Sequence, residues 1–423
     1  MQTLTALPPS KSVINRALLL AAMAHGQSQI KGASLFVPGL GDDITIMLRA
    51  LAGFGVGISL GDGEVRVQPP SGGFDAPPPL DVGSAGTALR FLLPLAALHS
   101  RSPVRFIGSK RLFERPLAPL LEALGSIGAR WHSDRDGGLL VPAESVPGFL
   151  DIEIDGSLSS QFVSGLAMAV AGTKGGGVLR LATRTASSGY LSLTKRWMKR
   201  FGCQVRLFPD RVEIPGGSLR AVSTEAMGDW SAAAALFCGA AIMGREIDLS
   251  PLDTTDGQPD AAILAILKSI GCSCKFDGHH CRLYGRINGG LDADLEPCPD
   301  LAPVLTAVAA FAPAPSELCG LGTLEHKESD RLGGCIKLAA WLGASAKLAP
   351  GHALRITPRP DSAEPFATEP FDPMGDHRMA FAAAIGGLRS GGMVLDAGCV
   401  SKSFPGFWEA INQHFCSANG GSL

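Results

Sequence analysis

Basic side chains recur beside short clusters of Ser, Thr, Asp and Gly along this chain of 423 residues. Arg and Lys bind phosphate and carboxylate groups, and the Arg fork binds them bidentately. Any one of these residues, taken alone, reads more readily as an ordinary surface charge. As a set, they indicate a binding site for small polyanions: Lys11, Arg16, Arg90, Arg115, Lys327, Arg331, Arg378 and Lys402.

Acidic residues in the same clusters are candidates for proton transfer. Asp300 lies in CPDLAP, and Glu328 lies between two cations in KESDR. A helix N-cap for Asp300 and a salt-bridge partner for Glu328 are equally open interpretations. Asp42, Asp43, Asp229 and Asp376 are more typical of caps or residues that orient an Arg. His377 could be a ligand or general acid, although a lone His is more often a hydrogen-bonded structural residue.

Composition and motifs exclude several function classes. The sequence has neither an HExxH motif nor a clustered His/Cys/Asp set, and neither GxGxxG after a strand nor GxxxxGK[ST], so we expect no metal and no cofactor. The net charge of −2, without a basic run, disfavours nucleic acid and membrane as partners. No apolar run reaches about 18 residues. The N-terminus does not resemble a signal peptide. The ten Cys, all from Cys203 onward, are irregularly spaced, which favours reduced thiols and a cytoplasmic protein.

A period of about 70 residues organises the chain. Helix-like segments such as LLEALGSIGARW and ILAILKSIGCSC end at a glycine and precede a strand–turn–strand pattern. Gly takes the left-handed conformation at a helix C-terminus at little cost. The closing glycines are Gly55, Gly128, Gly202, Gly271 and Gly343.

A second series of Ala/Leu-rich helices runs out of phase with the first. Each opens with a polar cluster, and each is apolar nearly all round, which predicts six buried helices. Their N-terminal amides and dipoles would attract anions. Landmark residues of the six are Arg16, Arg90, Gln161, Trp230, Leu301 and Arg378. Six copies of one unit predict two domains of three copies each, with the midpoint near Glu225 to Gly228.

Ten strings in order, from about Leu7 to about Trp408, resemble the 5-enolpyruvylshikimate-3-phosphate synthase family. They are PPSKSVINRALLLAAMAHG, DDITIML, GSAGTALRF, RLFERPLAPLLEAL, DGSLSSQF, GDWSAA, CPDLAP, KESDRL, GDHRMA and KSFPGF. The resemblance implies an α/β fold of two inside-out barrel domains, each with three βαβαββ units and helices inside. It implies a lobe at 10–226 that mainly binds shikimate 3-phosphate. A second lobe, from 1–9 and 227–423, would carry the catalytic carboxylates.

The resemblance also implies substrates and roles. The family joins phosphoenolpyruvate to shikimate 3-phosphate, with no cofactor, and a monomer is expected. Asp300 resembles the base that acts on the hydroxyl, Glu328 the acid that protonates the methylene, and Lys11 a residue that assists. Matching shikimate 3-phosphate ligands are Lys11, Ser12, Arg16, Ser159, Ser160, Gln161, Ser187, Tyr190, Asp300 and Lys327. Matching phosphoenolpyruvate ligands are Lys11, Gly86, Arg115, Gln161, Arg331, Arg378 and Lys402.

Some positions depart from the family pattern. Ser84 and Thr323 stand where the family usually has Asn, Pro9 where it has Gly, and Pro259 where it has the Gly of Gln-Gly-Asp. Two alternatives remain: UDP-N-acetylglucosamine enolpyruvyl transferase, and a polyanion-binding relative without catalysis. The former uses a Cys in a mobile loop of its first half, and this chain has no Cys before Cys203. Every interpretation as an enzyme requires the cations from both lobes to reach one site.

Overall fold

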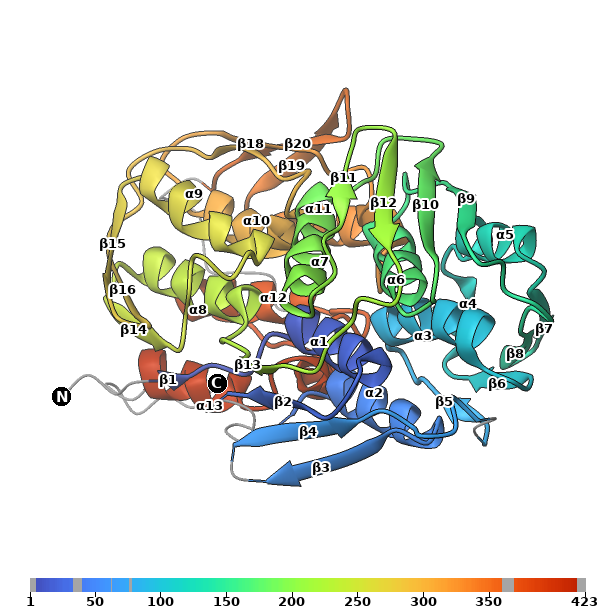
Figure 1. Cartoon of the computed structure of the whole chain (residues 1–423). Helices are drawn as coiled ribbons and strands as arrows, with labels where there is room; N and C mark the ends of the chain where they lie inside the picture. The colour runs from blue at the N-terminus through green and yellow to red at the C-terminus, as the bar shows by residue number, and fades with distance from the viewer. Residues whose placement is uncertain (1–4, 33–39, 62, 76–77, 360–368, 417–423) are drawn as a thin grey trace. The chain divides into compact units, whose positions relative to one another are not determined.

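The computed structural model describes residues 5–32, 40–61, 63–75, 78–359 and 369–416. It separates into two compact units (Figure 1). Among the described residues, unit 1 contains 5–9, 40–41, 227–359 and 369–416, and unit 2 contains 10–32, 42–61, 63–75 and 78–226. The chain enters unit 2 after Pro9 and returns to unit 1 after Ala226, and residues 40–41 also group with unit 1.

Five four-stranded sheets share one topology among the described residues. In each, two parallel strands lie side by side, and an antiparallel hairpin continues from the second of them. The three sheets of unit 2 are β13-β2-β4-β3 (Ser223–Glu225, Ser28–Lys31, Glu64–Gln68, Gly57–Gly61), β5-β6-β8-β7 (Leu80–Asp81, Val104–Ile107, Gly137–Val141, Arg130–Asp134) and β11-β12-β10-β9 (Arg206–Leu207, Arg211–Pro215, Gly176–Leu181, Leu150–Ile154). The two sheets of unit 1 are β1-β14-β16-β15 (Thr5–Ala6, Ile247–Ser250, His280–Gly285, Cys272–Asp277) and β17-β18-β20-β19 (Asp292–Asp294, Ser316–Cys319, Ala353–Thr357, Ser345–Ala349).

The first strand of two repeats comes from a distant part of the sequence. β1 pairs in parallel with β14, and β13 pairs in parallel with β2. In the sixth repeat, an isolated parallel bridge joins Phe371 to Val394 on either side of a helix. Five repeats therefore have the predicted βαβαββ order in space, and in the sixth the described residues show the bridge on either side of the buried helix.

Six buried helices form the interior of the units. They are α1 (Lys11–Met23), α3 (Gly86–His99) and α6 (Ser160–Ala171) in unit 2, and α8 (Trp230–Met243), α10 (Ala302–Ala310) and α12 (His377–Ser390) in unit 1. In α8 nearly every side chain is buried, including Trp230, Leu236 and Phe237. Truncating a buried Phe to Ala costs about 3–5 kcal/mol, so such helices hold each unit together. The prediction of six buried helices is confirmed.

The remaining helices are amphipathic and lie between the strands of each repeat. They are α2 (Asp42–Gly53), α4 (Lys110–Glu114), α5 (Ala118–Ser126), α7 (Ser188–Arg200), α9 (Ile263–Ser269), α11 (Arg331–Trp341) and α13 (Phe407–Ile411), with short turns η2 (Pro259–Ala262), η3 (Pro299–Leu301), η4 (Leu324–His326), η5 (Ala397–Lys402) and η6 (Asn412–Cys416). The five predicted closing glycines all have φ between 79° and 103°. The left-handed helix ends predicted from sequence are therefore confirmed.

The repeated α/β architecture is thus the one expected from the resemblance, and the fold class is confirmed. Within the described residues, no helix is long and apolar enough to cross a membrane.

Candidate active site

The N-termini of three helices in unit 1 carry Asp caps. Asp229 accepts hydrogen bonds from the amides of Ser231 and Ala232 at the start of α8. Asp330 caps α11, and Asp376 caps α12 by accepting from the Arg378 amide. These caps satisfy otherwise unpaired N–H groups, so they fix where the neighbouring basic side chains begin.

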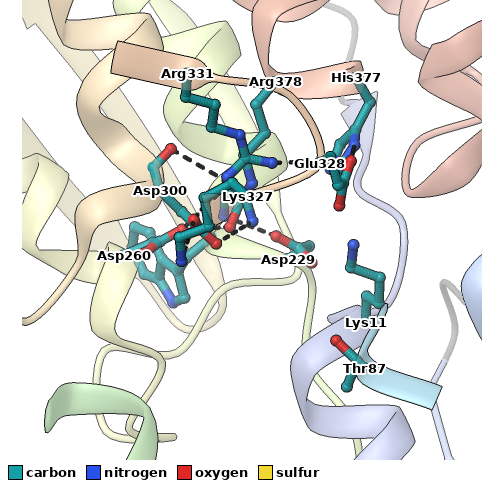
Figure 2. A network of polar contacts seen from close by, with 12 residues as sticks. Lys11, Thr87, Asp229, Asp260, Asp300, Lys327, Glu328, Arg331, His377 and Arg378 are labelled. Carbon is teal, nitrogen blue, oxygen red and sulfur yellow. Dashed lines mark hydrogen bonds and ion pairs between the residues drawn. The ribbon is translucent and has the colours of Figure 1, made fainter. Parts of the chain in front are cut away.

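Asp300, on η3 before α10, is surrounded by three cations (Figure 2). Its Oδ1 lies 2.8 Å from Arg331 NH1 and 3.4 Å from Lys327 Nζ, and its Oδ2 lies 3.0 Å from Arg378 NH2. This partly buried carboxylate therefore joins three helix starts of unit 1.

Three side chains meet at one oxygen of Glu328. Its Oε2 lies 3.0 Å from His377 Nδ1, 3.2 Å from Lys402 Nζ and 3.8 Å from Arg331 NH2. His377 is itself buried and packs edge-on against Phe381, so its ring has a fixed direction. His377 is thus placed to orient Glu328. This is the hydrogen-bonded structural role that the sequence offered for His377 as the alternative to a ligand or general acid.

Arg331 links both carboxylates to a third. Its guanidinium donates to both oxygens of Asp376, at 2.7 and 3.2 Å, and to Asp300. Burial by itself lowers the pKa of Arg331, but the charges of Asp376, Asp300 and Glu328 outweigh burial and raise it. Burial by itself raises the pKa of Asp376, but the Arg331 charge prevails and lowers it. Both groups are therefore charged.

One trio in unit 1 has the ligand types of a metal site. Oxygen and nitrogen atoms of Glu328, Asp376 and His377 lie within 4.8 Å of one another. The same Glu328 oxygen contacts Lys402, and Arg331 contacts both carboxylates of the trio. These two cations oppose the binding of a metal ion, which would be a third positive charge.

In unit 2, Lys11 stands at the first residue of α1. It is buried, and its Nζ lies 3.0 Å from Asp43 Oδ2, which is in the first turn of α2. Asp43 was predicted to be a cap or to orient an Arg, and it pairs with a Lys instead.

Arg16 lies one turn further along α1 and is 2% exposed. It donates to Thr194 Oγ1 at 2.8 Å and to the carbonyl oxygens of Ser12 and Tyr190 at 2.7 and 3.2 Å. Burial lowers the pKa of Arg16 to about 10. Among the described residues, no carboxylate pairs with this cation. An unneutralised buried guanidinium is costly, which favours an anionic ligand here.

The start of α6 presents Ser159, Ser160 and Gln161. The Ser159 hydroxyl caps the helix by accepting from the Gln161 amide N–H. The Gln161 side chain accepts from Arg90 NH1 and donates to Thr87 Oγ1, both at 3.1 Å. A helix N-terminus with a fixed amide and a hydroxyl is suited to a phosphate group.

Gly86 opens α3 against two arginines. A Cβ at this position would lie 2.5 Å from Arg115 NH1 and 2.8 Å from Arg90 NH1. Only Gly lets these guanidinium groups approach the helix start. Ser187 precedes α7 with φ of 54°, a left-handed conformation that is uncommon for Ser and concentrates at functional sites.

Comparisons with known proteins decide the family. The family model described as EPSP synthase (3-phosphoshikimate 1-carboxyvinyltransferase) matches residues 2–411. The chain belongs to this family.

Relatives and solved structures agree. A 3-phosphoshikimate 1-carboxyvinyltransferase of Methanoculleus marisnigri is 37% identical, over 96% of this chain and 94% of the relative. One from Pseudomonas syringae is 33% identical, over 96% and 93%. The structure of EPSP synthase from Acinetobacter baumannii has a TM-score of 0.74 at 23% identity, and covers 98% of this chain and 95% of that one. The enolpyruvyl transferase NikO from Streptomyces tendae has a TM-score of 0.70 at 14% identity, and covers 97% and 94%. At these identities the structures support the fold alone.

The predicted EPSP synthase residues group by unit. Asp300, Lys327, Glu328, Arg331, Arg378 and Lys402 form one cluster in unit 1. In unit 2, Gly86 lies against Arg115, Ser159 caps the helix that carries Ser160 and Gln161, and Arg16 binds the backbone of Ser12 and Tyr190. That the two groups serve one site stays a prediction.

Several contacts were not foreseen from sequence. Thr87 and Thr194 hold Gln161 and Arg16, and Asp260 faces Arg378. Neither threonine carries a spacing signal, because its role depends on which helices pack together. Asp260 is the last residue of Gln258-Pro259-Asp260, which stands where the family usually has Gln-Gly-Asp. This string was the only signal for Asp260 in the sequence.

Proposed function

We propose that this chain carries out the reaction of its family: it transfers the enolpyruvyl group of phosphoenolpyruvate to the 5-hydroxyl of shikimate 3-phosphate. The products are 5-enolpyruvylshikimate 3-phosphate and phosphate, in the route to chorismate and the aromatic amino acids. The observation that carries the proposal is the pairing of Asp300 and Glu328 through Arg331, with Lys327, Arg378, Lys402 and His377 around them.

The chemistry is addition followed by elimination. The hydroxyl oxygen attacks the carbon of phosphoenolpyruvate that bears the phosphate, while the methylene carbon gains a proton. The resulting tetrahedral ketal phosphate loses phosphate from that carbon and a proton from the methyl group, which restores the double bond. The enzyme therefore needs one base, one acid and groups that stabilise negative charge.

Asp300 is the proposed base for the hydroxyl. Its two oxygens are already directed by Arg331, Lys327 and Arg378, so the carboxylate has a fixed direction before substrate binds. Lys327 is the proposed partner of a ring hydroxyl, because its Nζ shares Oδ1 of Asp300. A hydroxyl placed between them can donate to Asp300.

Glu328 is the proposed acid for the methylene. His377 and Lys402 hold its Oε2, which gives the carboxyl a fixed direction. The two carboxyls differ in surroundings: Asp300 faces three cations of Lys and Arg, whereas Glu328 faces the His377 imidazole together with Lys402 and Arg331. Different surroundings are how two carboxyl groups take separate roles. Lys11, held by Asp43, is proposed to assist.

Shikimate 3-phosphate is proposed to bind mainly in unit 2. Its phosphate suits the start of α6, where Ser159, Ser160 and Gln161 lie. Ser187, which directly precedes α7, is a further proposed ligand. Its carboxylate suits Arg16 and Ser12 at α1, and Tyr190 would line the ring. The buried, unneutralised charge of Arg16 is the strongest support for this assignment.

Phosphoenolpyruvate is proposed to bind Lys11, Gly86, Arg115 and Gln161 of unit 2 and Arg331, Arg378 and Lys402 of unit 1. The proposal requires both units, since neither contains all the cations. We also propose that the chain is a cytoplasmic monomer, which gel filtration with light scattering tests for the oligomeric state.

Phosphate release tests the activity. With phosphoenolpyruvate present, we expect release with shikimate 3-phosphate and none with UDP-N-acetylglucosamine. Release with the sugar nucleotide alone would replace the proposal with the alternative transferase. No release with either acceptor, in protein that still binds phosphoenolpyruvate and shikimate 3-phosphate, would support the alternative of a polyanion-binding relative without catalysis. Asp300→Ala should abolish turnover while binding of shikimate 3-phosphate stays measurable.

A further inference from the structure

Asp260 is a buried carboxyl that the proposed mechanism does not use. It lies on η2, in a segment locked to the start of α8. Gln258 donates to the Gly228 carbonyl at 2.9 Å and accepts from the Trp230 amide at 3.1 Å. Ser231 donates its hydroxyl to Asp260 Oδ2. Because this segment is fixed on both sides, the Asp260 carboxyl has a set direction.

That direction is toward Arg378 (Figure 2). Arg378 NH1 lies 3.7 Å from Asp260 Oδ2, and NH2 lies 3.0 Å from Asp300 Oδ2. NH1 also donates to the Asp300 carbonyl at 3.5 Å. The guanidinium is therefore held between two carboxylates, one on η2 and one on η3. An anion that binds Arg378 adds negative charge beside both.

The two carboxylates differ in exposure. The Asp260 side chain is 2% exposed and the Asp300 side chain 16%. Burial is the main cause that raises the pKa of Asp260, to about 6, and Arg378 opposes that rise. The Asp300 and Asp229 charges add to the rise, the Ser231 hydrogen bond lowers it, and the Cys298 thiol adjoins the same carboxyls. A nearby anion would raise the pKa of Asp260 further, in the same direction as the Asp300 charge.

We propose that Asp260 is a positioning residue for the anion site: its carboxylate holds Arg378 in the empty site and takes up one proton when an anion occupies that guanidinium. The proton comes from solvent and goes to a carboxylate oxygen, so no other reactant is needed. Protonation removes the repulsion between Asp260 and the anion, while Asp300 stays paired with Arg378. The inference rests on the proposed function only in taking Arg378 as an anion ligand.

Calorimetric titration in buffers of different ionisation enthalpy measures proton uptake directly. We would titrate the full chain with phosphoenolpyruvate, and separately with sulfate, which has no titration near neutral pH. Uptake with sulfate therefore belongs to the protein. We expect about half a proton per site near pH 6.5, with uptake fading by pH 8.5. By linkage, the affinity for sulfate should weaken as pH rises across this range.

Asp260→Asn keeps the size and an acceptor for Ser231 but cannot titrate. We expect this variant to lose most of the uptake and to show a flatter dependence of affinity on pH. Asp256→Asn is the matched control: Asp256 is buried in the same segment and bonds to Gln258. Its uptake should equal that of the unaltered chain.

Two results would overturn the proposal. One is unchanged uptake in Asp260→Asn. The other, which needs no variant and so survives a folding failure, is that the unaltered chain binds sulfate near pH 6.5 with no proton uptake. Phosphate release in the turnover assay is a separate readout. A chain that turns over without this proton coupling keeps the proposed function and loses the role of Asp260.

Discussion

At the scale of single residues, the candidate site is a network of charge pairs that few substitutions can preserve. Arg331 illustrates this because it is 2% exposed and reaches Asp300, Asp376 and Glu328 at once. A planar fork with several fixed donors can do this, and a single ammonium group cannot. The identity of the cation therefore matters as much as its charge.

Arg331→Lys should accordingly lower kcat/KM by about a hundredfold or more, because removing a fixed charge-stabilising donor has about that effect. Steady-state kinetics measures it. Arg355→Lys is the control, since Arg355 on β20 is exposed and pairs with Glu317 on β18. Equal activity in both variants would mean that the Arg331 fork is not needed.

Gly86→Ala should raise the KM for phosphoenolpyruvate by about tenfold, equivalent to about 1.4 kcal/mol of binding. The added methyl group would meet Arg115 and Arg90, which must move away. Gly72→Ala is the control, because a Cβ at Gly72 meets nothing within 4 Å. A KM that stays at the unaltered value would show that Arg115 is not a ligand or that it shifts without loss.

At the scale of elements, glycines end the amphipathic helices in the left-handed conformation, and at Gly128 this conformation, not a lack of space, is the reason for Gly. Gly128, after α5, has φ of 93°, and its nearest neighbour for an added Cβ is 4.0 Å away. Gly125, within the same helix, is exposed and would meet nothing. The two positions therefore separate backbone strain from crowding.

Gly128→Ala should destabilise the chain by about 1–2 kcal/mol, the cost of a left-handed residue with a Cβ. Gly125→Ala should leave stability unchanged or raise it by up to about 1 kcal/mol, since Ala favours the helix. Urea denaturation measures both. If the two variants have equal stability, strain at the helix end is not what selects Gly128.

At the scale of the whole molecule, a partly buried histidine makes stability depend on pH. His99 ends α3, and its Nε2 lies 2.8 Å from the Ala169 carbonyl of α6. Burial lowers the pKa of His99, and the backbone hydrogen bond only partly opposes this. The unfolded chain therefore binds a proton before the folded chain does as pH falls below about 6.5.

Because the unfolded state then holds more protons, the free energy of unfolding falls as pH falls. We expect a loss of about 1 kcal/mol between pH 7.5 and pH 5.5 from this group. His99→Gln should remove that part of the pH dependence in denaturant titrations, and the exposed His132→Gln should retain it. Parallel pH curves for the unaltered chain and His99→Gln would contradict the assignment.

The sequence determined the periodic plan and the chemistry-bearing residues. Glycines at helix ends and helices apolar all round follow from local backbone preference and from the need to remove apolar surface from water. The string KESDR placed Glu328 one turn before Arg331 on the chain, so their proximity was readable. The cap role of Asp376 beside Arg378 was also readable, whereas the arginine that it orients, Arg331, lies 45 positions away.

Tertiary structure decided the pairs between repeats. Arg378 faces Asp260, Arg16 meets Thr194, and Gln161 meets Thr87, across separations of tens to hundreds of positions. No local rule encodes such pairs, because they depend on which buried helix packs beside which. In the same way, β1 and β13 join sheets whose other strands lie far away in the sequence. Long-range packing sets which donor reaches which acceptor, and burial then sets how strongly each charge is felt.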